Sequence, residues 1–261
     1  MKFKNLEFTN ADGLKLSARI DLTAAGDPLA YALFAHCFTC SKNIKAISHI
    51  SRALTLKGIA VLRFDFTGLG ESEGDFADTN FSSNVDDLVI AADFLKKNFQ
   101  APELLIGHSL GGAAVLQSAA RIPSAVAVIT IAAPADPGHV SRALGESSEI
   151  IERRGEADVE LAGRTFKIKK QFLDDLAGVR MQETIRNLNR ALLIFHSPYD
   201  RIVGIENAAK IFQTARHPKS FISLDKADHL LMDRQDSLYV GSLAATWALK
   251  YIAGRRICNE S

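Results

Sequence analysis

The chain has 261 residues, of which 47% are apolar and 23% are charged, and its formal net charge at pH 7 is +1. This composition is ordinary for a soluble globular protein, and a chain of this length can bury about three quarters of its unfolded surface in one α/β domain. The small net charge argues against a nucleic-acid-binding surface, because such proteins concentrate Lys and Arg on one face.

Two further features argue against a membrane-spanning protein and a disulfide-rich secreted protein. The apolar runs are all shorter than the ~18 residues that cross a bilayer, and residues 1–7 lack the apolar segment of a signal peptide. The three cysteines are an odd number and do not make a disulfide framework. We therefore expect a cytoplasmic protein with neither a membrane nor a nucleic acid as its partner.

The chain opens with a predicted β-hairpin, in which strands 3–9 and 14–22 flank a turn rich in Asn, Asp and Gly. Beyond it, short apolar runs alternate with helical patterns. The apolar runs are 30–35, 59–64, 104–106, 125–132, 191–195 and 220–224. The helical patterns are 44–56, 84–99, an alanine-rich stretch that ends near Pro123, 205–215 and 237–252. This alternation predicts an α/β fold with a mostly parallel central sheet and helices on both faces.

The alternation breaks between residues 134 and 189, where the chain is more charged. A helix over 149–154 and two short strands within 159–168 are predicted there. We interpret residues 134–189 as a small lid that is inserted over the carboxyl ends of the sheet. The lid belongs to a single domain that spans residues 1–261.

The segment Gly107-His108-Ser109-Leu110-Gly111 matches the G-x-S-x-G nucleophile elbow, and it lies between a predicted strand and a predicted helix, as this motif requires. The sharp turn forces an unfavourable backbone angle on the serine, and the two glycines relieve the crowding around it. Ser109 is therefore the predicted nucleophile. The alternative is a tight turn whose serine only caps the following helix.

A serine nucleophile needs a histidine base and an acid that orients it, and in this fold their chain order is Ser, Asp or Glu, His. His229 fits, because it follows the last predicted strand, where the loop opens at the carboxyl edge of the sheet. Asp200, which follows the preceding strand, is the predicted acid. Asp225 and Asp228 are closer to His229 in sequence and remain alternatives. Asp228 is adjacent to His229, so its side chain would normally diverge from the ring, and hydrogen bonding within the loop is its other explanation.

Acyl transfer also requires backbone N–H donors for the developing oxyanion. We assign one donor to Leu110, which follows the nucleophile, and the other to Phe38, in the loop after strand 30–35. The alternatives are that Phe38 only lines the pocket and that His36 is a structural histidine.

Cys37 and Cys40 form a C-x-x-C pair between a strand and a helix, which is also the position of a thioredoxin-like redox pair. A redox protein would leave Ser109, Asp200 and His229 unexplained. A second hypothesis is that oxidation of the pair distorts the oxyanion loop and switches an esterase off. A zinc site is less favoured, because no second Cys or His pair has suitable spacing.

Together these residues resemble the α/β-hydrolase superfamily. More narrowly, the chain resembles bacterial esterases and serine aminopeptidase-like hydrolases with a small lid between the sixth and seventh core strands. The family's H-G-F-T-G oxyanion loop corresponds to residues 36–40, with cysteine in place of both glycines. Residues 63–74 match R-x-D-x-x-G-x-G-x-S-x-G, to which we assign a structural role. Residues 36–74 are especially similar to hydrolase domains fused to an OsmC-type peroxidase domain, although no peroxidase activity is implied.

The resemblance implies a serine hydrolase that cleaves a small-molecule carboxylic ester, with a short to medium acyl or an aryl group, through an acyl-enzyme. It calls for neither a metal nor a cofactor. Thioesterase, peptidase and cofactor-free perhydrolase activities use the same triad and remain alternatives, as does a non-catalytic or redox protein on this fold. Candidate pocket residues are His36, Phe166, Phe172 and Met181, with packing inside the lid as the alternative for the last three. The sequence leaves open whether the protein is a homo-oligomer.

Overall fold

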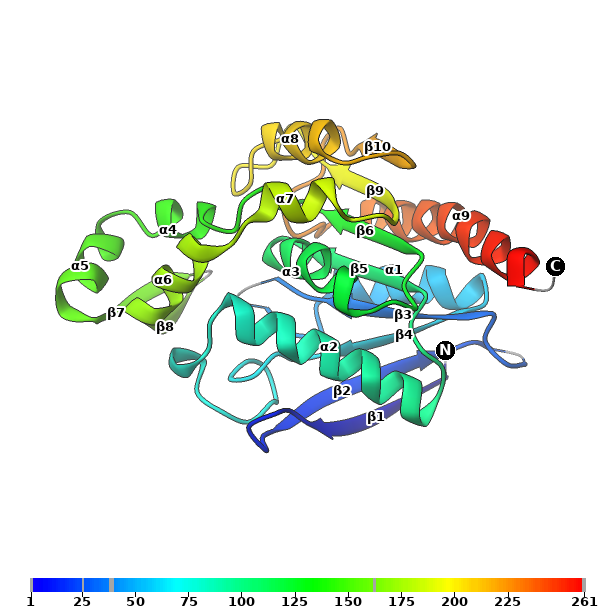
Figure 1. The fold of residues 1–261 in the computed structure, drawn as a ribbon, viewed down its shortest axis with the longest axis horizontal. Helices are drawn as coiled ribbons and strands as arrows, with labels where there is room; N and C mark the ends of the chain where they lie inside the picture. The colour runs from blue at the N-terminus through cyan, green and yellow to red at the C-terminus, as the bar shows by residue number, and fades with distance from the viewer. Residues whose placement is uncertain (1, 25, 38–39, 162, 260–261) are drawn as a thin grey trace.

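The computed structural model describes residues 2–24, 26–37, 40–161 and 163–259. Its centre is an eight-stranded sheet with the strand order β1-β2-β4-β3-β5-β6-β9-β10 (Figure 1). The strands are β1 (Lys2–Thr9), β2 (Lys15–Leu22), β3 (Ala30–Ala35), β4 (Ile59–Phe64), β5 (Leu104–His108), β6 (Ala127–Ile131), β9 (Ala191–His196) and β10 (Lys219–Ser223).

The sheet is parallel from β4 to β10, and β1 and β2 form an antiparallel hairpin at its edge. Every residue of β3, β4, β5, β6 and β9 is buried, which explains why these strands are mostly apolar rather than alternating between apolar and polar residues. The predicted α/β fold with a mostly parallel sheet is confirmed. The carboxyl ends of its parallel strands therefore share one edge of the sheet.

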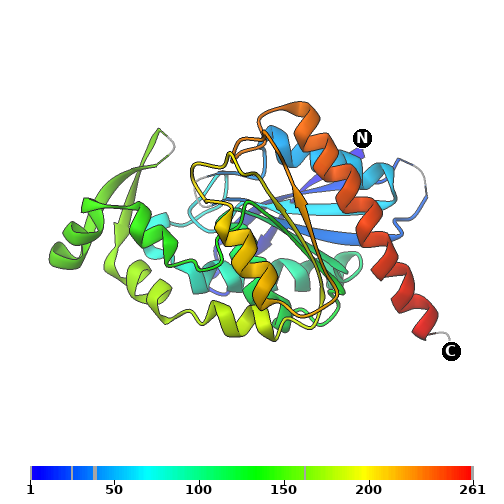
Figure 2. The same ribbon diagram turned by 90° about the horizontal axis from the view of Figure 1, so that it is seen from above.

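Helices cover both faces of the sheet (Figure 2). On one face, α1 (Lys45–Leu56) packs against α9 (Arg234–Asn259). The other face carries α2 (Phe81–Asn98), α3 (Leu110–Ser118) and α8 (Glu206–Thr214). The five buried strands β3, β4, β5, β6 and β9 supply both cores because successive side chains point to opposite faces: Leu33 joins the α2 and α3 side, whereas Phe34 joins the α1 and α9 side.

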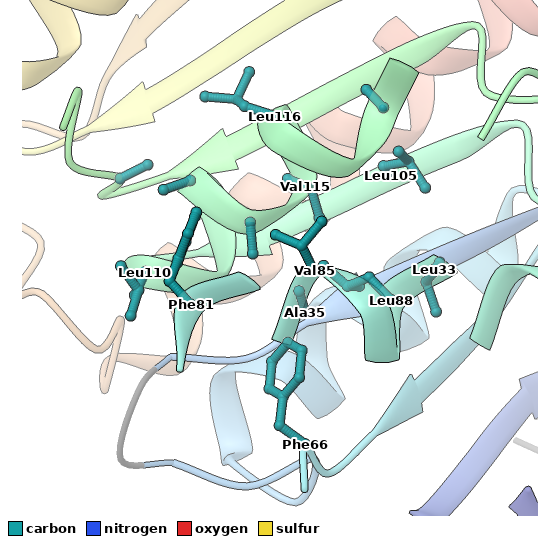
Figure 3. Packing of buried hydrophobic residues seen from close by; sticks show 14 of the residues in the cluster. Leu33, Ala35, Phe66, Phe81, Val85, Leu88, Leu105, Leu110, Val115 and Leu116 are labelled. Atoms are coloured by element: carbon teal, nitrogen blue, oxygen red, sulfur yellow. The ribbon is translucent and has the colours of Figure 1, made fainter. Parts of the chain in front are cut away.

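The core on the α2 and α3 side brings the helix after the nucleophile against the sheet. Figure 3 shows Val85 and Leu88 of α2, Val115 of α3, and Leu33 and Leu105 of the strands beneath them. These side chains are almost fully buried, and burial of such aliphatic groups contributes roughly 1.5–3 kcal/mol each. This packing holds α3 firmly against the sheet and so fixes the position of Leu110, the first residue of the helix.

The segment between β6 and β9 projects beyond the sheet at the end toward which these two strands point (Figure 1). It contains α4 (His139–Ala143), α5 (Glu146–Arg154), the hairpin β7 (Glu156–Leu161) and β8 (Arg164–Lys169), α6 (Lys170–Gly178) and α7 (Met181–Arg186). Ser82 at the start of α2 binds Asp175 of α6 through its N–H and its hydroxyl. Contacts of α7 with α3 attach the segment at a second place.

Several boundaries differ from those predicted. α2 begins at Phe81 rather than at residue 84, because Asn80 and Ser83 form a reciprocal capping box. The short helices α4, α6 and α7 were not predicted from the sequence. Two single-turn 3₁₀ helices, η1 (Phe76–Asp78) and η2 (Ala119–Arg121), also occur in the connections.

None of the helices in the described ranges has both the length and the apolar character that crossing a membrane requires.

Candidate active site

Ser109 lies in the sharp turn between β5 and α3, with φ 55° and ψ −127°. A residue with a Cβ rarely adopts a positive φ, so neighbouring contacts must hold this turn. A Cβ at Gly107 would overlap the carbonyl oxygen of Gly111, and a Cβ at Gly111 would overlap that of His36. The Ser109 N–H also donates to the Ile131 carbonyl of β6 at 2.8 Å. The two glycines thus let β5, α3 and the β3 loop approach closely around the serine.

His229 lies in the loop between β10 and α9, and its ring reaches Ser109. Its Nε2 is 3.0 Å from Ser109 Oγ, and its side chain is 10% exposed. The two residues are 120 positions apart in the sequence, and only the parallel sheet brings their loops to the same edge. The ring is accessible enough to exchange a proton with a bound molecule.

Asp200, in the loop after β9, completes a chain of hydrogen bonds. Its Oδ2 is 2.7 Å from His229 Nδ1, and its Oδ1 accepts the N–H groups of Ile202 and Val203, each at 2.9 Å. Burial alone would raise the pKa of Asp200, but the hydrogen bond and charge of His229 and the two N–H donors outweigh it and lower the pKa. Asp200 is therefore an anion at neutral pH.

An ionised Asp200 determines which ring nitrogen of His229 carries the proton. A carboxylate can only accept a hydrogen bond, so Nδ1 is the donor to Asp200. Nε2 is then left unprotonated in the neutral ring and accepts the hydroxyl of Ser109. This is the tautomer that a general base for Ser109 needs.

The other candidate acids make different contacts. Asp225 accepts the hydroxyl of Ser223 at 3.1 Å, and Asp228 accepts the N–H groups of Leu230 and Met232 within its own loop. Asp228 thus has the loop role that was considered for it, and Asp225 binds the last residue of β10. Across the described ranges, no three His, Cys, Asp or Glu side chains are grouped as they would be around a metal ion.

The predicted oxyanion loop follows β3. Phe38, the second predicted donor, lies outside the described residues. Leu110 is the first residue of α3, and the N–H groups of a first helical turn have no acceptor within the helix. Its N–H is thus free of the helix ladder beside Ser109, where an oxyanion donor is required.

The described part of the oxyanion loop is held at its beginning by His36. The buried His36 ring donates from Nδ1 to the Cys37 carbonyl at 2.7 Å and accepts the Phe66 N–H at Nε2. Burial lowers the pKa of His36, so the ring is neutral. Cys37 and Cys40 form a disulfide, and the Cys40 N–H also donates to the Cys37 carbonyl at 3.1 Å.

A buried ionic network holds the other end of this loop. Asp65 accepts both the N–H and the Nζ of Lys42, each at 2.6 Å, and Arg63 binds Asp21 at 2.9 Å and the carbonyl of Lys42. All four side chains are at most 3% exposed. Lys42 and Asp21 were missed by the sequence analysis, because neither belongs to a recognisable motif.

The four candidate pocket residues occupy different surroundings. His36 lies beside Leu110 in a small cavity next to the elbow. Phe166 and Phe172 pack against Phe76 of η1, with ring centroids 5.2 and 6.3 Å apart, and belong to the apolar core between the inserted segment and the sheet. Met181 contributes to the wall of an open groove of about 1010 Å³ between α4, α7 and α8.

The chain is similar to known hydrolases in sequence and in fold. Residues 30–153 match the family model described as serine aminopeptidase, S33. The crystal structure of the esterase domain of a Rhodothermus marinus protein is 53% identical, with a TM-score of 0.80 over 97% of this chain and 100% of that domain. Est1E from Butyrivibrio proteoclasticus, with ferulic acid bound, has the same fold at 23% identity, with a TM-score of 0.83 over 95% of this chain and 99% of Est1E. The mitochondrial palmitoyl-protein thioesterase ABHD10 of Mus musculus is 27% identical over 187 residues, which are 69% of this chain and 62% of the thioesterase.

Proposed function

The chain belongs to the α/β-hydrolase superfamily, in its serine esterase-like group, and from this premise we propose that it hydrolyses carboxylic esters through an acyl-enzyme on Ser109. The observation that carries the proposal is the continuous pair of hydrogen bonds from Asp200 through His229 to Ser109, at 2.7 and 3.0 Å. The 53% identical esterase domain supports an ester as the substrate class.

In the first half of the reaction, His229 Nε2 takes the hydroxyl proton of Ser109 while Oγ attacks the ester carbonyl carbon. Asp200 keeps the ring in the required tautomer and stabilises the imidazolium that forms. The Leu110 N–H and a second donor, which we assign to Phe38, stabilise the oxyanion. The imidazolium then gives its proton to the departing alcohol, and Ser109 retains the acyl group.

In the second half, a water molecule replaces the alcohol. His229 takes a proton from this water, whose oxygen attacks the acyl carbon, and the proton then returns to Ser109 Oγ as the carboxylic acid leaves. The proton balance closes after each turnover, so Ser109, His229 and Asp200 end as they began. No step uses a metal ion or an organic cofactor.

We propose that residues 134–189 act as a lid within a single domain, and that the groove between α4, α7 and α8 receives one side of the ester. The groove combines the apolar side chains of Met181 and Val179 with the charges of Arg180 and Lys210. At about 1010 Å³, the groove has room for a short to medium acyl group or an aryl group.

Thioester hydrolysis is the second candidate, because a thioesterase is among the relatives and uses chemistry that the same triad can perform. Rates with matched p-nitrophenyl acetate and thioacetate substrates distinguish the two activities. Ester hydrolysis by the wild-type protein, with Ser109→Ala reduced by several orders of magnitude, supports the proposal. Equal rates for wild type and Ser109→Ala, or a fluorophosphonate label on another peptide, would contradict it.

A further inference from the structure

His108, at the end of β5, connects the nucleophile elbow to the loop that carries His229. Its Nε2 is 2.6 Å from the backbone carbonyl oxygen of His229, and the two ring centroids are 5.1 Å apart. The His108 side chain is deeply buried, with the residue 5% exposed. His108 takes no chemical step in the proposed ester hydrolysis.

The direction of this hydrogen bond follows from its partners. A carbonyl oxygen can only accept, so His108 Nε2 must carry the proton and donate it. Burial, followed by the neighbouring charge of His229, lowers the pKa of His108 to about 3, although the hydrogen bond itself and Asp200 act in the opposite direction. The ring is therefore neutral throughout the pH range in which a serine esterase works.

We propose that His108 is a positioning residue, whose Nε2–H fixes the backbone of His229 so that the imidazole stays within reach of Ser109. This inference rests on the proposed function, since it concerns the geometry of the same base. The bond reaches a backbone carbonyl rather than the reacting ring. It therefore persists when the His229 ring becomes an imidazolium and its hydrogen bond to Ser109 is broken.

The loop that carries His229 needs such an attachment. Many of its hydrogen bonds lie inside the loop itself: Ala227 to Leu224, Leu231 to Asp228, and the carboxylate of Asp228 to two N–H groups. Leu231 also has φ 52°, an unfavourable angle that surrounding contacts must maintain. Among the described residues, hydrogen bonds join His229 to Asp200, Ser109 and His108.

The other two buried histidines at strand ends act differently. His196 donates to the Val203 carbonyl at 2.7 Å, and His36 donates to the Cys37 carbonyl, so each shapes the loop that it begins. His108 instead connects two loops that are 121 positions apart. A displacement of about 1 Å at a catalytic group can lower a rate by about 100-fold. Loss of the His108 bond would allow such a displacement of His229, and kcat should then fall.

The test compares two variants of equal side-chain length. Gln places an amide N–H close to the position of the histidine Nε2, whereas Met has no donor. For p-nitrophenyl acetate, we expect His108→Met to lower kcat about 10- to 100-fold with KM changed less than about twofold. We expect His108→Gln to restore kcat to within about fivefold of wild type.

A stability control separates positioning from general loosening of the fold. Ile252 is buried in α9, 18 residues beyond Arg234 and therefore about 27 Å along the helix from its start. Ile252→Ala should lower the melting temperature of the protein by several degrees, because it leaves a cavity in the core, while leaving kcat per folded molecule unchanged. A similar kcat loss in this variant would show that instability alone explains the effect and would overturn the inference.

A measurement on the wild-type protein tests whether His108 Nε2 carries the donated proton, even if His108→Met does not fold. Nitrogen NMR of ¹⁵N-labelled histidine should show the His108 ring neutral and protonated at Nε2, and an Nδ1-protonated ring would overturn the inference. Equal kcat values for wild type and His108→Met, or equal losses in the Met and Gln variants, would also overturn it. If Ser109→Ala abolishes hydrolysis in the same experiments, the proposed function stands regardless of the His108 result.

Discussion

The carbonyl oxygen of His36 lies against the α-carbon of Gly111, so closely that a Cβ on Gly111 would overlap it. His36 begins the oxyanion loop and Gly111 is the second residue of α3, so this contact sets the spacing between the loop and the nucleophile elbow. The absence of a side chain at position 111 is therefore a requirement of the site rather than of the helix, in which alanine would be preferred.

Gly111→Ala should displace the oxyanion loop from Ser109. We expect kcat for p-nitrophenyl acetate to fall about 100-fold or more, which is the cost of losing one oxyanion donor. Gly254→Ala is the matched control, because nothing lies within 4 Å of a Cβ built there. Wild-type kcat in Gly111→Ala would show that the loop adapts and that the contact has no functional role.

Asp200→Asn should remove the anion that selects the His229 tautomer while leaving the side-chain shape unchanged. The amide N–H₂ would favour a ring protonated at Nε2, which cannot accept the Ser109 proton, so we expect kcat to fall about 10⁴-fold. Asp225→Asn changes a carboxylate that accepts the hydroxyl of Ser223 rather than a bond from His229, and should keep wild-type activity. If Asp225→Asn is inactive and Asp200→Asn active, the acid has been assigned to the wrong residue.

The features that could be predicted from the sequence are those with a local signal. Apolar runs predicted the bounds of β3 and β4 correctly, because a strand that is buried on both faces is mostly apolar from end to end, with Arg63 as the exception in β4. The convergence of Ser109, His229 and Asp200 followed from topology, since residues that end parallel strands meet at one edge of the sheet.

Features that depend on long-range packing could not be predicted. The helices α4, α6 and α7 have five to nine residues, too few for stability in isolation, and form only where the inserted segment packs on η1, α2 and α3. Burial of Lys42 and Arg63 contradicts the usual exposure of charged residues, and is possible only because the fold brings Asp65 and Asp21 to them. The bond of His108 to the backbone of His229 has no signal in either local sequence.

Acid should destabilise the fold through its buried neutral histidines. Burial lowers the pKa of His36, His108 and His196 in the folded state, so below about pH 6.5 the unfolded chain binds more protons than the native protein. The stability that these residues contribute is complete above that pH and is lost as the pH falls. Asp87 has the opposite effect on stability. Burial raises its pKa to about 6, so below that pH the native protein binds a proton at Asp87 that the unfolded chain does not yet bind.

A variant separates the contribution of His108 from the others. Between about pH 6 and pH 4, the free energy of unfolding from urea titrations should fall more steeply for wild type than for His108→Gln, by about 1.4 kcal/mol per pH unit at most. Asp87 and the other two histidines are present in both proteins, so their contributions cancel. Parallel slopes would mean that His108 is protonated in the native state at these pH values.

A bulky side chain in the groove should discriminate between substrates. Gln182 is an exposed residue of the groove wall, and Gln182→Trp should raise KM for p-nitrophenyl octanoate several-fold while leaving KM for the acetate unchanged. Leu56→Trp adds the same indole on α1, outside the groove, and serves as the control. An unchanged ratio of the two KM values would remove the groove from the proposed substrate path.

Reduction of the Cys37–Cys40 disulfide should change the activity of the protein. The disulfide joins the two cysteines on either side of the position to which the second oxyanion donor is assigned, so we expect its formation to disturb the alignment of that donor with the substrate oxygen. We therefore expect kcat to rise when dithiothreitol reduces the disulfide to two thiols, itself becoming a cyclic disulfide, and to fall again with glutathione disulfide. The double variant Cys37→Ala and Cys40→Ala should have a kcat that neither reagent alters. Equal kcat values for the oxidised and reduced wild-type protein would exclude redox control by this disulfide. If a reagent still alters kcat in the double variant, the effect arises from Cys258 or from another part of the chain.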